Sequence, residues 1–382
     1  MSVEPLDEPA THVQRPSPAL SPESVPARDM VLDVQDFSVD YGTGAAMVRA
    51  VNNVSFTLKR STVLGVAGES GSGKSTLVYG MTRLLREPGI ISGGVVNLYV
   101  TSKDKSSEEV LDLMMADEKQ LRAIRWSHVS IVLQSALSAL DPVRRVGKEF
   151  NEVLKTHRPD MSKSERVDRA RTLLAMVGLN EDRLERFPHE LSGGQRQRIM
   201  IALALALEPE LVIMDEPTTA LDVVTQREII NELLDLRTQL NFAMIFITHD
   251  LSLLVELADE IVVMYAGRIV ERARADELYE APRHPYTLGL LNSFPPMSGE
   301  RRELVGIPGS PPDLADLPIG CTFQQRCPYV MDRCRKEEPP LATLAGTGRQ
   351  VACWLHNGGP GVQVPVELTK HVRSASLPGD HR

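Results

Sequence analysis

Apolar and polar residues alternate along two neighbouring stretches near the start of the chain. The first is VLDVQDFSVDY at 31–41, and the second is VRAVNNVSFTL at 48–58. Because successive side chains of a β-strand point to opposite faces, this alternation is typical of strands with one buried face. The two stretches therefore predict an antiparallel sheet at the beginning of the folded chain.

Three shorter stretches are apolar with hardly any interruption: VLGVAG at 63–68, LVIMD at 211–215 and AMIFIT at 243–248. Runs of this kind suit strands that are buried on both faces. Apolar residues at helical spacing follow the first strand at 77–85 and separate the other two at 225–240. Strands that alternate with helices indicate an α/β layer with a parallel sheet.

A long helical stretch interrupts this alternation. Helical spacing recurs in FNEVLKTH at 150–157 and in RARTLLAMVGL at 169–179, without runs typical of strands. We therefore expect a helical subdomain at about 137–195. Beyond the last buried strand, VVMYAGRIVER at 262–272 predicts a hairpin that turns at Ala266-Gly267.

The composition changes at both ends of this unit, which we expect to span residues 30–282. Residues 1–29 are rich in Pro, Ser and acidic residues and lack an apolar signal core, which predicts a disordered extension. After about residue 283 the chain is rich in Pro, Gly and Cys, which predicts a separate C-terminal module at 283–360 and a flexible tail at 361–382.

Length and charge narrow the classes of protein. With 382 residues and 42% hydrophobic content, the chain can bury a large core. Its net charge of -9 disfavours binding of nucleic acid through general basicity. The longest apolar run, 199–207, is much shorter than the roughly 20 residues of a membrane-spanning helix. We expect a cytosolic protein, in which structural disulfides would be unusual.

The loop after the first buried strand carries a phosphate-binding pattern. GESGSGKST at 68–76 fits G-x-x-x-x-G-K-[ST] and lies between a predicted strand and a predicted helix. Gly71 and Gly73 allow backbone N–H groups to converge on phosphate oxygens at the start of the helix. Lys74 adds a positive charge, and the Ser75 hydroxyl suits Mg²⁺. The alternative, a glycine-rich turn that matches by chance, is disfavoured by this context.

Polar residues at the ends of other strands complete a candidate hydrolytic site. Asp215 is a candidate Mg²⁺ partner, directly or through water, and Glu216 could accept a proton from the attacking water. The alternative is that these two acids cap the next helix. His249 could contact a γ-phosphate or orient the water, although a lone histidine after a strand is more often a loop or capping residue. The amide of Gln134, after the apolar run VSIVLQ, could reach both Mg²⁺ and water.

A second candidate anion site lies in LSGGQ at 191–195. Ser192 and the amides of Gly193 and Gly194 precede a predicted helix, so they could bind an anion. Binding there should be weak, because the stretch lacks a lysine. The pattern thus raises the question of why one chain carries two phosphate sites.

Together these elements resemble the ATP-binding cassette family of transport ATPases, over about residues 31–274. The resemblance implies the nucleotide-binding domain of that family, with a RecA-like phosphate-loop core, an antiparallel β subdomain and an α-helical subdomain. It also implies MgATP as the ligand and a set of site residues. The adenine contact is Tyr41; the Walker A contacts are Ser70, Gly71, Ser72, Gly73, Lys74, Ser75 and Thr76; the signature contacts are Ser192, Gly193, Gly194 and Gln195; the D-loop residue is Asp222; the catalytic residues are Glu216, His249 and Gln134; the Mg²⁺ partners are Ser75, Gln134 and Asp215.

The same resemblance implies why there are two phosphate sites. In that family the signature motif of one chain contacts the γ-phosphate bound to the facing chain, so two chains complete two sites. The implied partners are a second ATPase subunit, with a paralogue favoured, two transmembrane permease subunits, and an extracytoplasmic solute-binding protein that acts through the permease. The implied location is the cytoplasmic face of the membrane, and no nucleic acid partner is expected.

The region after residue 283 resembles the C-terminal region of ATPase subunits from oligopeptide and dipeptide importers. The resemblance rests on HPYT at 284–287 and on four cysteines spaced C-x5-C-x6-C-x18-C, namely Cys321, Cys327, Cys334 and Cys353. In some members four cysteines in this pattern hold a [4Fe–4S] cluster. Structural zinc and unligated cysteines remain alternatives, although zinc ligands typically occur in C-x2–4-C pairs.

The sequence departs from the family pattern in two places, and the second bears on the inferred cargo. Ser61-Thr62 stands where the family usually has Gly-Glu, and Ser135-Ala136 follows Gln134 where an acidic or Asp-Pro pair is usual. The second departure lies where such an ATPase meets its permease. The expected function is ATP hydrolysis that drives peptide uptake; import of nickel or oligosaccharides by the same machinery, or a soluble ATPase without a transport role, are the alternatives.

Overall fold

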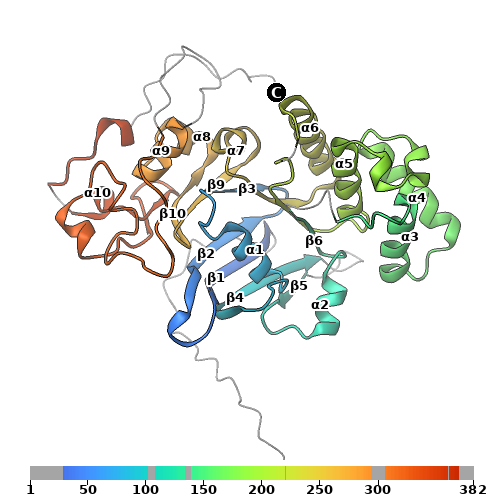
Figure 1. Cartoon of the computed structure of the whole chain (residues 1–382), viewed down its shortest axis with the longest axis horizontal. Coiled ribbons are helices and arrows are strands. Elements are labelled where there is room, and N and C mark those ends of the chain that lie inside the picture. Colours follow the sequence, from blue (N-terminus) through green and yellow to red (C-terminus); the bar gives the residue numbers. More distant parts are fainter. Residues whose placement is uncertain are drawn as a thin grey trace, which may run out of the picture.

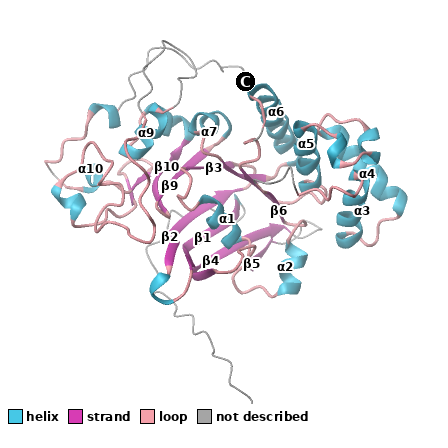
Figure 2. Cartoon of the chain, in the orientation of Figure 1, coloured by secondary structure: helices cyan, strands magenta, loops and turns pink. Residues whose placement is uncertain are grey.

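The computed structural model describes residues 29–101, 108–133, 139–219, 221–293, 306–359 and 361–369. The framework consists of two β-sheets with helices around them (Figures 1 and 2). The predicted N-terminal extension, apart from Asp29, and the end of the predicted tail beyond residue 369 lie outside the described residues.

The smaller sheet has four strands in the order β2-β1-β4-β5. They are β1 (Met30–Tyr41), β2 (Val48–Lys59), β4 (Gly89–Thr101) and β5 (Glu108–Asp112), and neighbouring strands are antiparallel. A 3₁₀ turn at Gly44–Ala46 joins β1 to β2, and α2 (Glu118–Ile124) follows β5. The antiparallel pairing of the first two strands was predicted, whereas β4 and β5 were missed.

β1 departs from strict alternation at its centre. Four buried residues lie on each side of the exposed pair Gln35 and Asp36, where the register with β2 shifts and Asp36 has a φ of 48°. An irregularity of this kind changes which face the following side chains occupy. The strand therefore buries more of its residues than a half-buried pattern predicts.

The larger sheet has eight strands in the order β11-β12-β10-β9-β3-β8-β7-β6. Its parallel part comprises β3 (Val63–Ala67), β6 (Val129–Val132), β7 (Leu211–Asp215), β8 (Ala243–Ile247) and β9 (Glu260–Tyr265). Every residue of β3, β7 and β8 is buried. The predicted α/β layer is therefore confirmed.

Alternate side chains of this sheet enter two different cores. Val63, Met214 and Phe246 pack into a core that they share with α5 (Gly193–Ala204), α6 (Val223–Leu240) and α7 (Leu251–Leu257). Leu64, Ile213 and Ile245 instead join a core with the smaller sheet and α1 (Lys74–Met81). Burial on both faces explains the apolar runs of these strands.

The predicted hairpin is formed by β9 and β10 (Arg268–Arg274), which pair antiparallel. Its two turn residues, Ala266 and Gly267, have φ values of 48° and 78°. Positive φ at both central residues suits the twist of a two-residue hairpin, and glycine adopts it without a steric cost. The prediction of this turn is confirmed.

The stretch between β6 and β7 is helical, as predicted. It contains α3 (Val146–His157) and α4 (Lys163–Met176), followed by 3₁₀ helices at Glu181–Glu185 and Pro188–Glu190 that lead into α5. Figure 1 shows these helices grouped at one end of the molecule. In the described part of the stretch there is no β-strand.

The C-terminal segment, which we define as the described residues after 283, extends the larger sheet. Its short strands β12 (Gln350–Val351) and β11 (Ala342–Thr343) add to β10 at the edge of that sheet. The helices near and within the segment are α8 (Ala275–Glu280), α9 (Pro285–Asn292) and α10 (Trp354–Asn357), with 3₁₀ helices at Asp332–Arg335 and Val366–Leu368. The segment also has a small core around Val351, Cys353, Leu355 and Leu368.

The segment is thus joined to the cassette through backbone pairing, and Phe323 packs in the same core as β3 and β7. A separate module with limits at 283 and 360 stays a prediction. In the described part of the chain, no helix combines the length and the apolar character needed to cross a membrane.

Candidate functional site

The phosphate loop connects β3 to α1 and takes a conformation that requires glycine at both ends. Gly68 and Gly73 have φ values of 150° and 99°. A Cβ at Gly68 would lie 2.4 Å from the Met264 carbonyl oxygen, and one at Gly73 would lie 2.4 Å from the Ala50 carbonyl oxygen. Gly71 also has positive φ, but a Cβ there would meet nothing within 4 Å. The loop is therefore held at its ends and open at its middle.

Lys74 lies inside this loop, with only 5% of its surface exposed. Its Nζ donates hydrogen bonds to the carbonyl oxygens of Gly68 at 2.7 Å and Glu69 at 2.9 Å. Burial lowers the pKa of Lys74, while the negative charges of Glu216, Asp215 and Glu69 act against that shift. The ammonium group is thus placed in the arc of the loop, where phosphate oxygens could replace the two carbonyls.

Asp215 and Ser75 bring two oxygen atoms together beside the loop. Ser75 Oγ donates to Asp215 Oδ1 at 3.1 Å, and Asp215 is fully buried at the end of β7. Asp215 Oδ2 is buried and has no hydrogen bond of normal geometry among the described residues. Burial raises the pKa of this carboxyl, while the Tyr79 phenol lies close enough to act against that shift. Oxygen ligands suit Mg²⁺, so a buried carboxylate oxygen beside a hydroxyl fits a magnesium ion bound together with phosphate.

Glu216 and His249 meet at the ends of two neighbouring strands. Glu216 Oε1 lies 3.7 Å from His249 Nδ1, and Thr219 Oγ1 donates to Glu216 Oε2 at 3.0 Å. Glu216 has a φ of 47°, in the left-handed region that costs energy for a residue with a side chain. The chain takes this conformation where it leaves β7, directly after Asp215.

The second anion motif begins α5. Ser192 is the N-cap of this 12-residue helix: its Oγ accepts from the Gln195 backbone N–H at 3.3 Å, and Gln195 Oε1 accepts from the Ser192 N–H at 3.2 Å. A Cβ at Gly194 would lie 2.7 Å from Thr225 Cγ2, so α5 packs closely on the start of α6. Figure 1 shows α5 well apart from α1. The two predicted phosphate sites therefore lie on different parts of the chain.

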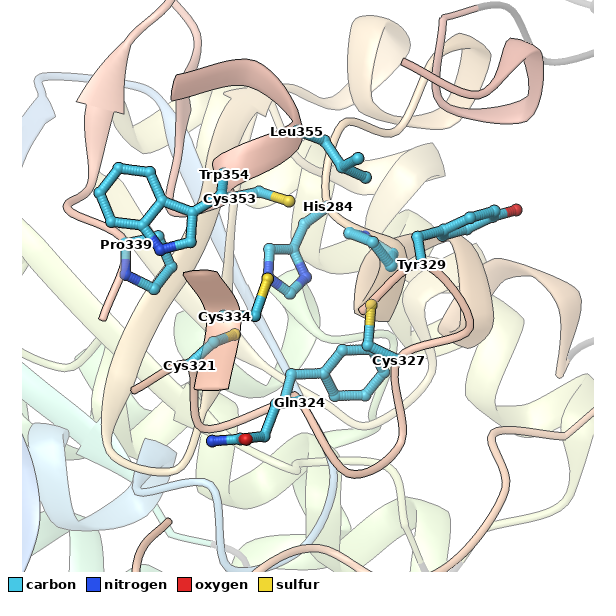
Figure 3. Close-up of a pocket in the computed structure, with 12 residues that line it drawn as sticks. His284, Cys321, Gln324, Cys327, Tyr329, Cys334, Pro339, Cys353, Trp354 and Leu355 are labelled. Carbon is cyan, nitrogen blue, oxygen red and sulfur yellow. The ribbon is translucent and has the colours of Figure 1, made fainter. Parts of the chain in front are cut away.

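The four cysteines line a single pocket in the C-terminal segment (Figure 3). None of them forms a disulfide, and Figure 3 shows the sulfur atoms gathered around His284. The other walls are largely apolar and include Phe323, Trp354 and Leu355. Widely spaced positions in the sequence thus converge in space.

Burial raises the pKa of the thiol of Cys321 to about 12 and that of Cys327 to about 11, and nearby cysteines add to both shifts. Burial and the nearby cysteines also raise the pKa of the Cys353 thiol. Without a metal these thiols are therefore protonated at neutral pH. Over the described ranges, no three or more His, Cys, Asp or Glu side chains are arranged to hold a metal ion.

One ring nitrogen of His284 is engaged within the fold. Its Nδ1 accepts a hydrogen bond from the Tyr286 backbone N–H at 3.1 Å, which makes it the N-cap of α9. Burial lowers the pKa of His284 to about 3, so its ring is neutral at physiological pH. Its observed role is to begin a helix.

Comparison with known proteins places this chain in a family. Residues 51–219 match the family described as ABC transporter, and residues 270–334 match the oligopeptide/dipeptide transporter C-terminal region. The oligopeptide transport ATP-binding protein OppD of Salmonella typhimurium is 41% identical over 351 residues, which cover 91% of this chain and 97% of that protein. This chain belongs to the ATP-binding cassette transporter family. It is an ATPase of that class, as predicted.

Other relatives agree with this placement. The dipeptide transport ATP-binding protein DppD of Escherichia coli is 42% identical over 325 residues, which cover 85% of this chain and 96% of that protein. A solved dimeric, post-hydrolysis structure of the ATP-binding cassette MJ0796 bound to ADP and Pi is 27% identical, with a TM-score of 0.55 over 64% of this chain and 98% of that one. The predicted cassette fold is therefore confirmed.

The remaining predicted residues of this cassette have the following positions. Tyr41 is half-buried at the end of β1, paired with Gly89 of β4. Ser70 is exposed, Thr76 is half-buried, and Ser72 Oγ is buried without a hydrogen-bond partner in the described part of the chain. Asp222 is the N-cap of α6, where its Oδ1 accepts from the Thr225 N–H at 3.0 Å. Gln134 lies outside the described residues.

Sequence reasoning missed other residues at the nucleotide site. Tyr79 follows Ser75 by one helical turn on α1, and burial together with the nearby charge of Asp215 raises the pKa of its phenol to about 12. Helical spacing from Ser75 could have found Tyr79. Glu69 and Arg326 pair across 257 positions, and no local pattern signals such a contact.

Proposed function

We propose that this chain binds MgATP at its Walker A loop and hydrolyses it between two cassette subunits to drive peptide uptake through a separate permease. The observation that supports this most strongly is the division of the site within one chain. Lys74, Ser75 and Asp215 surround one phosphate position, whereas the signature helix α5 begins elsewhere. A second chain that faces this one head to tail supplies the missing half.

Within one chain, the proposed roles follow from the contacts. Lys74 and the amides of 70–76 hold the β- and γ-phosphates, and Ser75 and Asp215 hold Mg²⁺. Glu216 accepts the proton of the attacking water, and His249, 3.7 Å away, orients the water and the γ-phosphate. Gln134 is assigned to Mg²⁺ and water on the family resemblance alone.

Between chains, the signature residues Ser192, Gly193, Gly194 and Gln195 contact the γ-phosphate of the partner's nucleotide. The start of a 12-residue helix provides amides and a favourable dipole for this contact. Asp222 lies at the adjacent start of α6, and Tyr41 stacks on adenine. The solved relative MJ0796 is described as dimeric, which supports pairing.

The cargo and partners are proposed from the relatives. OppD and DppD are named for oligopeptide and dipeptide transport, and residues 270–334 match the C-terminal region of that group. We therefore assign peptides as the cargo, and two permease subunits, a paralogous ATPase and an extracytoplasmic binding protein as partners. The chain then works at the cytoplasmic face of the membrane. The domain limits proposed are 30–282 for the cassette, with its helical subdomain at 137–195, and 283–360 for the Cys- and Pro-rich module.

The hydrolytic assignment is tested with Glu216→Gln. Loss of the general base should reduce ATP turnover by about 100-fold or more while ATP still binds, so the variant should accumulate as a nucleotide-bound pair of cassettes. Turnover is measured in the assembled transporter, and pairing by light scattering with MgATP. Lys74→Ala is the control and should lose ATP binding. Undiminished turnover in Glu216→Gln would remove Glu216 from this role.

We also propose that Cys321, Cys327, Cys334 and Cys353 hold a [4Fe–4S] cluster. The proposal rests mainly on the resemblance to importer subunits. The four thiols line one largely apolar pocket, but in the described part of the chain no three of them are yet arranged to hold a metal ion. A bound cluster would contribute folding free energy to a segment whose own core is small. Without a metal, the raised pKa values of Cys321 and Cys327 keep these two thiols protonated at neutral pH.

Iron and acid-labile sulfide in anaerobically purified protein test the cluster. About four of each per chain are expected, and Cys334→Ser should lose both and unfold at lower denaturant concentration. Ser310→Ala, which changes an exposed position of the same segment, is the control and should retain both. Stoichiometric zinc, or thiols that stay unligated in anaerobic protein, would contradict the cluster.

A further inference from the structure

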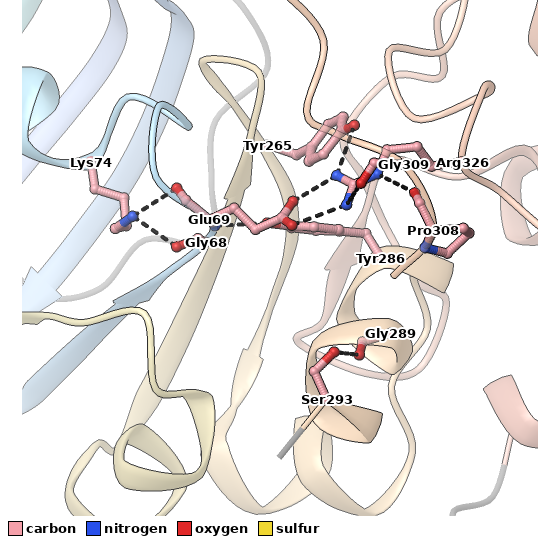
Figure 4. A network of polar contacts seen from close by, with 10 residues as sticks. All are labelled: Gly68, Glu69, Lys74, Tyr265, Tyr286, Gly289, Ser293, Pro308, Gly309 and Arg326. Carbon is pink, nitrogen blue, oxygen red and sulfur yellow. Dashed lines mark hydrogen bonds and ion pairs between the residues drawn. The ribbon is translucent and has the colours of Figure 1, made fainter. Parts of the chain in front are cut away.

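The Walker A loop is tied directly to the C-terminal segment (Figure 4). Arg326 Nη1 donates to Glu69 Oε2 at 2.7 Å, and Arg326 Nη2 donates to Glu69 Oε1 at 3.0 Å. The Arg326 side chain is 5% exposed and that of Glu69 is 28% exposed. Two parallel bonds between a guanidinium and a carboxylate fix both position and orientation.

Arg326 is itself held rigidly on the C-terminal side. Its Nε donates to the Pro308 carbonyl oxygen at 2.8 Å, and its guanidinium lies 5.9 Å from the centre of the Tyr265 ring. Tyr265, Tyr286 and Phe323 form a contiguous aromatic group beside it. The guanidinium is therefore a fixed anchor for Glu69.

A second contact fixes the backbone of the same loop residue. The Glu69 N–H donates to Tyr286 Oη at 2.8 Å, and Tyr286 is fully buried on α9. The Glu69 carbonyl oxygen accepts from Lys74 Nζ at 2.9 Å. The amide, the carbonyl and the carboxylate of Glu69 are thus all engaged, two of them by residues more than 200 positions away in the sequence.

Stability alone does not explain this ion pair. A buried pair loses about as much in desolvation as it gains in attraction, so apolar replacements are often neutral or stabilising. A fixed orientation at Glu69, by contrast, restricts the loop whose amides must converge on phosphate. The apparent Kd of a ligand equals its intrinsic Kd divided by the fraction of protein in the competent conformation, so a smaller competent fraction weakens binding.

We propose that Arg326 and Glu69 are positioning residues for ATP, through which the C-terminal segment sets the conformation of the Walker A loop. This inference rests on the proposed ATPase function and deepens it. Neither side chain contacts the reacting phosphate; Arg326 acts through Glu69, and Glu69 acts through the loop that carries Lys74. The groups assigned to hydrolysis, Glu216 and His249, follow other strands, β7 and β8.

The test is the effect of Arg326→Gln on ATP hydrolysis by the assembled transporter. Loss of the anchor should raise KM for ATP about tenfold, as expected if about a tenth of the loops are competent, and leave kcat unchanged. Glu69→Gln should have the same effect, and the double variant should be no worse than either single variant. Arg326→Lys, which keeps the charge but not the paired bonds, should give an intermediate KM.

Arg333→Gln is the matched control in the same segment. Arg333 pairs with Glu337 and lies over the Trp354 ring, so its loss should leave KM unchanged. A purely structural role for Arg326 predicts a smaller folded fraction, which lowers the apparent kcat and not KM. That result, or a wild-type KM in Arg326→Gln, would overturn the inference.

Two further outcomes are distinguishable. If Arg326→Gln does not fold, Glu69→Gln carries the test, because it removes the same pair from the loop side. If the wild-type chain itself binds no ATP, the proposed function fails and this inference fails with it. If the wild type and the variants all bind ATP with the same affinity, the positioning role alone is overturned and the proposed function stands.

Discussion

Two buried aspartates show how surroundings decide the chemistry of one residue type. Asp215 is fully buried beside Ser75, and burial raises the pKa of its carboxyl. Asp40 is 3% exposed, but hydrogen bonds from Arg49 at 2.9 and 3.1 Å hold the pKa of its carboxyl below the usual value. In the part of the chain that the structure describes, Asp215 thus has no guanidinium bound to it, and burial outweighs the nearby charge of Lys74, whereas Asp40 is held as a carboxylate by Arg49.

The Asp40–Arg49 pair predicts a pH dependence of stability. Because the folded pKa of Asp40 is lowered, the pair stabilises the fold fully above the unfolded value of about 3.9, and this contribution is lost as the pH falls through the lowered folded pKa. Asp40→Asn should cost under about 1 kcal/mol at pH 7, since Arg49 is 44% exposed and screened. Urea unfolding at pH 7 to 3 should show the wild type and variant converging at low pH. A difference that grows on acidification would contradict the prediction.

At the scale of elements, the start of α5 has an observed role and a proposed role that use the same atoms. In the single chain the Ser192 hydroxyl caps its own helix by accepting from the Gln195 N–H. In the proposed pair of chains, the same hydroxyl and the first amides contact a partner's phosphate. A serine satisfies both requirements because its hydroxyl can donate as well as accept.

The observed and the proposed role of Ser192 predict different outcomes for two variants. Ser192→Ala should destabilise the isolated chain by about 1 kcal/mol through loss of the cap. Ser192→Asp should keep that stability, because aspartate is an equally good N-cap, but should abolish ATP-dependent pairing by repelling the γ-phosphate. Thermal unfolding and light scattering with MgATP in the Glu216→Gln background measure the two effects. Pairing that survives Ser192→Asp would contradict the signature contact.

Sequence patterns predicted the elements unevenly, for physical reasons. β3, β7 and β8 were predicted because strands buried on both faces are almost entirely apolar, and the Ala266-Gly267 turn was predicted because few residues suit positive φ. β4 was missed. It begins with GIISGG, which has three glycines and no clear period, and its burial depends on pairing with β1 and β5. Long-range pairing of this kind leaves little local signal.

At the scale of the whole molecule, a buried charged pair joins the cassette to the C-terminal segment. Glu271 of β10 is fully buried, and Arg349 Nη2 donates to its Oε1 at 3.1 Å. The backbone N–H groups of Arg283 and His284 donate to the same carboxylate, each at 2.8 Å. Glu271 therefore holds both the start of α9 and the residue that precedes β12 against the larger sheet.

Removal of one partner from this cluster should be costly. Arg349→Met leaves Glu271 buried without its cation and should destabilise the chain by about 3–5 kcal/mol. Glu271→Gln/Arg349→Met removes both charges and should recover part of that loss. Urea unfolding of both variants beside the wild type measures the difference. A double variant that is less stable than Arg349→Met would show that the charge of Glu271 is satisfied without Arg349.

The sequence by itself determined the parts of this protein whose chemistry is local. The Walker A loop, the acids after LVIMD and the LSGGQ helix start each need particular residues at fixed short spacing, because a tight turn, a strand end and a helix cap are formed by neighbours in the chain. The roles of individual residues within these motifs are still proposals. Only the tertiary structure decided how distant groups meet. Four cysteines line one pocket, Glu216 lies beside His249, and Arg326 forms an ion pair with Glu69. Contacts across 257 positions depend on the packing of whole sheets and helices, so no window of sequence contains them.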